Sequence, residues 1–317
     1  MRAYLELIRL PNVFTAMADV MLGFLLTHDS LEPWPVFALL MASSAALYSA
    51  GMVLNDLFDL MIDMKERPDR PLPSGRVRVR TAIRLGRGLL AGGVLLGWAA
   101  SAVDWQLRGD WQWRSGLVAT LLAVAVVAYD KTLKRTPLAP LAMGACRFLN
   151  VLLGASAATG AVVPTVWHPM VWLVAAGVGV YVAGVTWFAR KEAGASSRLQ
   201  LALAIPVIAA GIALLAWYPS WADNNLTLVS WPRFAEKIGL RWYFLWMVLG
   251  GLILWRCARA VVDPSNARVQ AAVRHCILSL VVLDAAACFG VRDIFWATMI
   301  LLLVLPAMFL SRWLYST

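Results

Sequence analysis

Residues 55–75 read NDLFDLMIDMKERPDRPLPSG, and the rest of the chain is organised around this stretch. It follows residues 35–54, which contain no charged residue, and its first sixteen residues carry five carboxylates and three cations. Placing so many charged side chains in lipid would cost too much free energy. The stretch is therefore predicted to lie in water, at the end of a membrane helix. If that helix continued through the junction, one of its faces would carry four polar residues, at helical spacings of three and four: Asn55, Asp56, Asp59 and Asp63.

Stacked carboxylates repel one another, so this acidic face predicts a bound cation. Mg²⁺ takes oxygen ligands and is commonly shared between carboxylates and substrate phosphates. We therefore expect Asn55, Asp59 and Asp63 to hold magnesium, with a diphosphate as its partner. The following prolines disfavour helix, so Arg67 and Arg70 are expected on a stiff basic loop over the site, where they would contact the substrate.

The composition is that of a membrane protein. With 317 residues, 61% of them hydrophobic, and a mean hydropathy of +0.71, the chain is far more apolar than a soluble domain. We expect one all-α domain over residues 1–317, a bundle of nine to ten transmembrane helices. The candidate spans are residues 11–27, 35–55, 83–103, 115–130, 138–160, 169–189, 199–218, 241–258, 271–290 and 294–311.

The distribution of lysine and arginine predicts the orientation. Alternating the ten spans from a cytoplasmic N-terminus places 22 of the 28 basic residues inside, in keeping with the positive-inside rule. Both termini and the acidic stretch are then cytoplasmic, in the plasma membrane if the source is bacterial. The net charge of +10 is thus explained by topology, and we expect the lipid bilayer, not nucleic acid, as the partner of these charges. The six outer cations are Arg108, Arg114, Arg233, Lys237, Arg241 and Arg292.

Several polar residues lie within the apolar spans. Asp19 falls about two turns into the first span, and ionisable groups at that depth usually face a cavity and mark function. A structural pairing with a neighbouring helix explains Asp19 equally well. Asn12, Arg147 and Asn150 are expected to point into the same cavity and contact substrate.

Two further basic segments are predicted at the cytoplasmic side. The fourth span ends in a segment with Tyr129, Lys134 and Arg135, and the sixth ends at Arg190, Lys191 and Glu192. Lysine and arginine are the usual phosphate partners, the first as a point charge and the second as a fork. We expect both segments to contact a diphosphate, although positive-inside loops would have the same composition.

These residues carry a resemblance to a known family. The motif N-D-x-x-D-x-x-x-D followed by R-P-x-R-P-x-P-S-G resembles the first aspartate-rich motif of the UbiA superfamily of intramembrane prenyltransferases, and Y-x-x-x-L-K-R from Tyr129 resembles its second-loop signature. The segment from Asp263 to Asp284 resembles the branch often labelled EboC. The resemblance implies a UbiA-type fold and Mg²⁺-dependent transfer of an isoprenoid from a prenyl diphosphate to a small aromatic or hydroxylated acceptor, with catalytic residues Asn55, Asp56, Asp59 and Asp63.

The chain departs from the family pattern at the end of the sixth span. Family enzymes usually carry a second D-x-x-x-D there for a second magnesium, whereas this chain has Thr186 and Arg190. Either Arg190 binds the diphosphate directly and neutralises its charge, or the chain is a non-catalytic or altered-substrate descendant of the scaffold. A small-molecule transporter is the remaining alternative, although the sequence shows no inverted repeat or paired broken helices.

Overall fold

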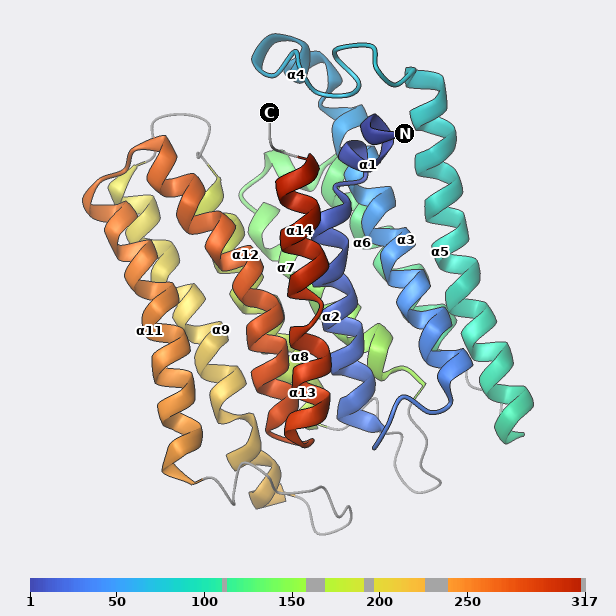
Figure 1. The fold of residues 1–317 in the computed structure, drawn as a ribbon, viewed down its shortest axis with the longest axis vertical. Helices are drawn as coiled ribbons and strands as arrows, with labels where there is room; N and C mark the ends of the chain where they lie inside the picture. Colours follow the sequence, from blue (N-terminus) through green and yellow to red (C-terminus); the bar gives the residue numbers. More distant parts are fainter. Residues whose placement is uncertain (110–112, 158–168, 191–196, 226–238, 315–317) are drawn as a thin grey trace.

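The structure is a computed structural model that describes residues 1–109, 113–157, 169–190, 197–225 and 239–314, and helices dominate it (Figure 1). These residues form no strand. The helices are α1 (Arg2–Leu7), α2 (Leu10–Thr27), α3 (Trp34–Phe58), α4 (Leu60–Glu66), α5 (Val79–Arg108), α6 (Arg114–Lys131), η1 (Leu133–Arg135), α7 (Ala139–Ala155), α8 (Pro169–Ala189), α9 (Arg198–Asn225), α11 (Leu240–Val262), α12 (Asn266–Phe289), α13 (Ile294–Leu301) and α14 (Val304–Leu314).

The predicted spans coincide with these helices, and the all-helical membrane fold is confirmed. Eight segments of the described chain are long and apolar enough to cross a bilayer: α2, α3, α5, α8, α9, α11, α12 and the α13–α14 pair. The other two predicted spans correspond to α6, with 18 residues, and α7, with 17 residues, which fall short of that criterion. The last span differs from the prediction because it is interrupted between Leu301 and Val304. The protein is therefore an integral membrane protein.

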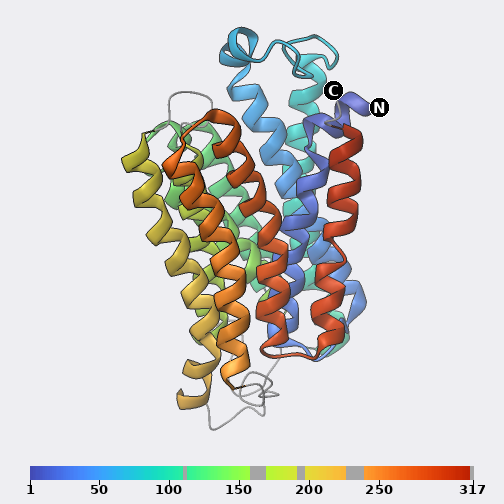
Figure 2. The same cartoon turned by 60° about the vertical axis from the view of Figure 1, so that its left-hand side comes forward.

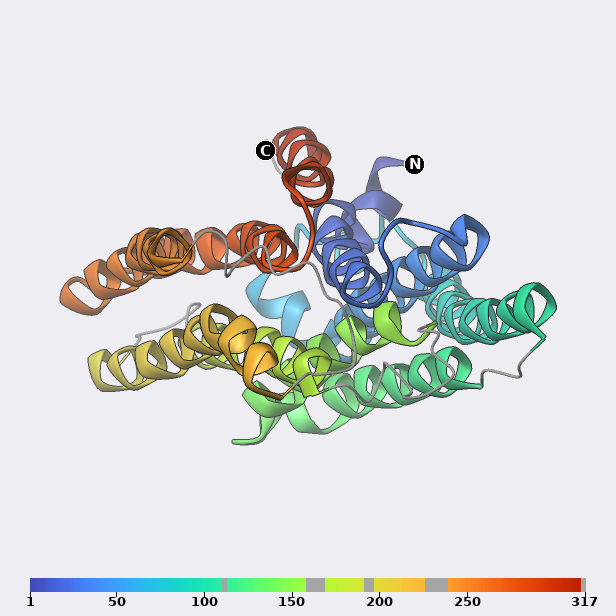
Figure 3. The same cartoon turned by 90° about the horizontal axis from the view of Figure 1, so that it is seen from below.

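The bundle has an open, layered arrangement. Seen from below, α11 and α12 form one row and α8 and α9 lie in a row opposite, while α13 and α14 stand beside α2 (Figure 3). The view turned by 60° shows the same long helices running side by side (Figure 2). Helix α2 packs against α3 and α7 from the first half of the chain and against α12 and α14 from its end. It therefore joins the N-terminal and C-terminal parts of the bundle.

The charged stretch lies at one end of the bundle. Figure 1 places α4 at the same end as both chain termini, in keeping with the predicted topology. The helix does not run straight through, however: α3 ends at Phe58, Asp59 adopts φ −96° and ψ 2°, and α4 begins at Leu60. The expectation of one continuous acidic helix face is therefore wrong, because the break at Asp59 turns the chain between the second and third aspartates.

Close packing of α2 on α7 fixes the middle of the bundle. A Cβ added at Gly154 would collide with the Val20 carbonyl oxygen, and one added at Gly23 would collide with that of Val151. The two glycines thus let the backbones approach each other, as small residues commonly do between membrane helices. This contact sets the spacing between the polar residues of α2 and those of α7.

Replacing Gly154 with alanine should therefore destabilise the protein. The new methyl group would force α2 and α7 apart, and such overpacking costs about 1–3 kcal/mol. The unfolding midpoint in detergent should fall for Gly154→Ala. Gly88→Ala is the matched control, since a Cβ there meets nothing within 4 Å. Equal midpoints for the two variants would contradict this packing.

Candidate active site

One cluster of charges forms where α3 meets the segment after α6. The Lys134 Nζ atom lies 2.8 Å from Asp59 Oδ2 and 3.1 Å from Asn55 Oδ1. The Arg135 guanidinium adds a contact of 3.3 Å to Asp59 Oδ1. The structure thus brings the predicted second-loop cations directly to Asn55 and Asp59 of the acidic motif.

A second cluster forms on the other side of the same helix end. Asp56 and Asp63 are each 4% exposed and share the Arg70 guanidinium, whose Nη1 lies 3.5 Å from Asp56 Oδ1 and 2.7 Å from Asp63 Oδ2. Arg9 also contacts Asp56 Oδ1, at 3.1 Å. The four predicted residues therefore divide into two pairs, Asn55 with Asp59 and Asp56 with Asp63.

This division bears on the predicted magnesium site. Within the described part of the chain, no group of three or more His, Cys, Asp or Glu side chains is placed to hold a metal. Asn55 and Asp59 contact Lys134, whereas Asp63 contacts Arg70. Each pair, however, directs two oxygens at a single cationic nitrogen, from Lys134 in one case and Arg70 in the other. Magnesium prefers a few carboxylate or amide oxygens with the remaining positions left to water and phosphate, so either oxygen pair fits the ion.

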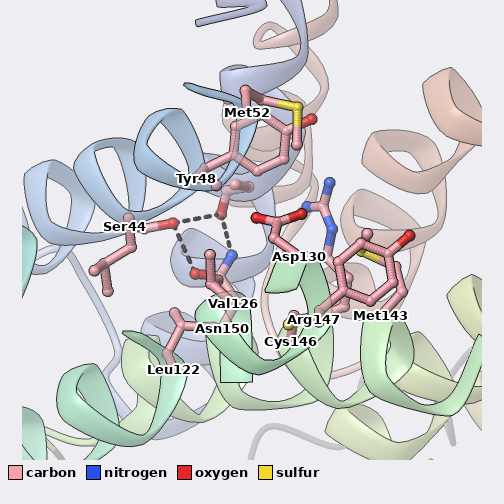
Figure 4. Close-up of a pocket in the computed structure, with 14 residues that line it drawn as sticks. Ser44, Tyr48, Met52, Leu122, Val126, Asp130, Met143, Cys146, Arg147 and Asn150 are labelled. Carbon is pink, nitrogen blue, oxygen red and sulfur yellow. Dashed lines mark hydrogen bonds between the residues drawn. The ribbon is translucent and has the colours of Figure 1, made fainter. Parts of the chain in front are cut away.

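A small cavity lies one helical turn below the first cluster (Figure 4). Its volume is about 60 Å³, enough for a few water molecules, and α2, α3, α6 and α7 wall it. Met52 and Asp130 line it, three residues before Asn55 and four before Lys134 respectively. The lining residues are Ala16, Ser44, Leu47, Tyr48, Gly51, Met52, Leu122, Val126, Tyr129, Asp130, Met143, Cys146, Arg147 and Asn150.

A buried polar network forms the floor of this cavity. Arg147 Nη1 donates to Asp19 Oδ2 at 2.9 Å, and Asn150 Nδ2 donates to the same oxygen at 3.0 Å. Ser44 donates to Asn150 Oδ1 at 2.7 Å, which links α3 to the pair. Arg147 and Asn150 line the cavity as predicted, whereas Asp19 is fully buried behind them and close to Asp284 of α12. Asp19 thus pairs with a neighbouring helix, which is one of the two explanations that the sequence left open for it.

The remaining predicted site residues lie elsewhere at this end. Asn12 and Arg67 line a wide groove of about 1540 Å³ between the N-terminal segment, the basic loop, α12 and α14, so Asn12 does not share a cavity with Asp19. Arg190 is exposed and donates to the Thr136 carbonyl at 3.0 Å, two residues from Lys134. Lys191 and Glu192 lie outside the described residues.

Among the cavity residues that carry a hydroxyl or carboxyl group, three were not predicted from the sequence: Ser44, Tyr48 and Asp130. Ser44 and Tyr48 lie in an uncharged span and give no signal of their own. Asp130 does, because it is a carboxylate at the end of an apolar helix, the same pattern that identifies Asp56 and Asp59. It follows Tyr129 directly, at a position that the second-loop pattern Y-x-x-x-L-K-R leaves open.

A helical membrane bundle with paired acids and cations over a cavity between its helices has the arrangement of an intramembrane site for a charged ligand. The model of the UbiA prenyltransferase family matches residues 16–279, which is most of the chain. The chain therefore belongs to the UbiA prenyltransferase family, as the aspartate-rich motif indicated.

Similar proteins agree with this assignment. The chain is 38% identical over 138 residues to digeranylgeranylglyceryl phosphate synthase from Ignicoccus hospitalis, covering 44% of this chain and 41% of that protein. The counterpart from Methanopyrus kandleri is 35% identical over 173 residues, or 55% and 57% of the two chains. The chain thus matches about half the length of these relatives. A UbiA homologue from Archaeoglobus fulgidus, solved with GPP and Mg²⁺, shares the fold with a TM-score of 0.58 at 16% identity, covering 94% of this chain and 99% of that one.

Breaking the buried ion pair between Asp19 and Arg147 should lower the stability of the protein. Arg147→Met would leave Asp19 charged without its cation, a loss that typically costs about 3–5 kcal/mol. The double variant Asp19→Leu with Arg147→Met removes both charges, so it should recover most of that stability. Thermal unfolding in detergent measures both changes.

The control is Arg80→Met, which removes an exposed arginine and should leave the midpoint unchanged. An Arg147→Met variant as stable as this control would show that the Asp19 pair does not hold α2 to α7.

Proposed function

We propose that the protein transfers an isoprenoid chain, with magnesium, from a prenyl diphosphate to a small hydroxylated acceptor. The observation that carries the proposal is the placement of Asn55, Asp59 and Lys134 together, one turn above a cavity that α2, α3, α6 and α7 line. Family membership supports it, as does the solved A. fulgidus homologue that holds GPP and Mg²⁺ in a similar fold.

In this proposal the basic side chains bind the diphosphate. Lys134 and Arg135 form ion pairs with Asp59. A diphosphate that binds next to them can accept their hydrogen bonds in place of the Asp59 carboxylate. Mg²⁺ held by the oxygens released in this way, those of Asn55 and Asp59, would neutralise charge on the leaving group. Because that charge grows as the carbon–oxygen bond breaks, these contacts lower the barrier as well as bind the donor.

The cavity below would hold the allylic end of the donor. Leu47, Leu122, Val126 and Met143 are apolar and keep water from a developing carbocation. The rings of Tyr48 and Tyr129 line the same space and can stabilise positive charge through their π faces. A prenyl tail is much larger than 60 Å³, so the rest of the chain would extend along the apolar helices.

Arg190 would assist from the side of α8. Its hydrogen bond to Thr136 holds it against the segment that carries Lys134, and an arginine fork can neutralise a diphosphate without recruiting a second ion. This role would account for the missing second aspartate motif. The Arg67 and Arg70 loop, with Arg9, supplies further positive charge on the other side of Asp56. The site would then face the cytoplasm, as the charge distribution predicts.

The direct test is diphosphate release from labelled prenyl diphosphates by purified protein, with native lipid extract as the pool of acceptors. Release should require Mg²⁺, and Asp59→Ala should lower it by about a hundredfold or more, because a ligand to the leaving-group charge is lost. The variant should still insert and fold, since Asp59 lies at a wet helix end. The control is Asp69→Ala, which removes an exposed acid from the basic loop that carries Arg67 and Arg70. This variant should retain wild-type activity.

Retention of most activity by Asp59→Ala would refute the proposed role of the acidic motif. Uptake of a labelled substrate into vesicles without any diphosphate release would instead favour the transporter alternative.

A further inference from the structure

Asp130 differs from every other acid near the site. It is 2% exposed, lies at the end of α6, and lines the cavity, where Figure 4 shows its carboxylate among the central side chains. Asp56, Asp59 and Asp63 are all in ion pairs, as is Asp19 below. The structure gives the Asp130 carboxylate no hydrogen bond or ion pair with any residue of its described part.

The surroundings of Asp130 leave its carboxylate available. Its Oδ2 lies 3.8 Å from the position where a Cβ on Gly51 would stand, so the absence of a side chain there keeps the space in front of it open. The charges that act on Asp130 come from Lys134, Arg9, Asp59 and Asp56, at the diphosphate end of the cavity, and neither cation forms an ion pair with it. A buried carboxyl without a hydrogen-bond donor is costly, unless a ligand supplies the donor.

The reaction proposed above creates a need for such a group. An acceptor R–OH that attacks the prenyl carbon forms an oxygen–carbon bond, the carbon–oxygen bond to diphosphate breaks, and the hydroxyl proton must leave. Asp59 and Lys134 are committed to the diphosphate, and the Asp19 carboxylate is committed to Arg147 and Asn150. Of the described carboxylates that line the cavity, Asp130 alone can take that proton.

We propose that Asp130 is a catalytic residue that accepts the hydrogen bond of the acceptor hydroxyl and takes its proton as the prenyl bond forms. The inference rests on the proposed function and narrows its acceptor to a molecule with an ionisable O–H. The acceptor oxygen would lie within hydrogen-bonding reach of Asp130, one turn from Lys134, which places it next to the donor carbon. The hydrogen-bonded pair of Ser44 and Asn150 lines the same cavity and can orient the acceptor.

The rival role for Asp130 is that of a metal ligand replacing the missing second motif. The geometry speaks against it, because Asp130 forms no ion pair with the cations that Asn55 and Asp59 hold, and the Asp59 oxygens point to Lys134 and Arg135. The two roles differ in what a variant loses. A lost base slows transfer alone, whereas a lost ligand weakens magnesium and donor binding as well.

The experiment compares Asp130→Asn and Asp130→Ala with wild type in full-length protein reconstituted in nanodiscs. Labelled geranylgeranyl diphosphate and Mg²⁺ are supplied with lipid extract as the hydroxyl pool, or with azide, a nucleophile that has no proton to lose. Donor affinity is measured separately with the non-reacting thiolodiphosphate analogue, which also reports that each variant is folded. Asp69→Asn, at an exposed acid on the basic loop, is the control.

Both Asp130 variants should lose about 10²–10⁴-fold in transfer to hydroxyl acceptors, the usual range for a general base. Their affinity for the donor analogue and their requirement for Mg²⁺ should stay at wild-type values. Azide should restore diphosphate release and give prenyl azide in Asp130→Ala, where the removed side chain leaves room for it.

Three results would overturn the inference: wild-type transfer by Asp130→Asn, a weakened donor affinity or raised Mg²⁺ requirement, or failure of azide to restore release in a variant that binds the donor analogue normally. Absence of Mg²⁺-dependent diphosphate release from the wild type would be a different failure. It would overturn the proposed function itself, and the inference with it.

Discussion

The pairing of the acidic helix end with cations from three other segments is the interaction on which the structure of this site depends. Four polar side chains at the end of α3 and the start of α4 would repel one another if left alone. Arg9 from the N-terminus, Arg70 from the basic loop, and Lys134 with Arg135 after α6 relieve that repulsion. The same contacts gather the ends of α2, α3 and α6 over the cavity. Because carboxylates hold these cations, a diphosphate can compete for them.

Much of the fold follows from the sequence because the bilayer imposes simple constraints. Apolar runs of about 20 residues mark the spans, and the alternation of basic loops orders them. The class of side chain at the site was also predictable, since acids clustered at the end of an apolar helix need cations to offset their repulsion. Arg147 and Asn150 were placed on the cavity because polar residues in a lipid-spanning segment usually face the bundle interior.

The details that could not be predicted depend on tertiary contacts. The break at Asp59 has no proline or glycine to announce it, so the spacing of the aspartates suggested one face where the structure has two pairs. Asn12 and Asp19 both lie on α2 but have different surroundings. Asn12 lines the groove at one end of the helix, whereas Asp19 is buried in the bundle interior further along. Ser44 and Tyr48 reach the cavity only because α3 packs against α2 and α7, where Ser44 bonds to Ala16 and Asn150 and the Tyr48 ring faces Arg147.

The central claim is that the Asn55 and Asp59 oxygens exchange a protein cation for magnesium when a prenyl diphosphate binds. A structure of the protein with Mg²⁺ and a non-reacting prenyl thiolodiphosphate tests it most directly. The account predicts that the ion is ligated by Asn55 and Asp59 and that Lys134 has left Asp59 for the diphosphate. An ion bound elsewhere, with the contact of 2.8 Å between Lys134 and Asp59 intact beside the bound analogue, would contradict it.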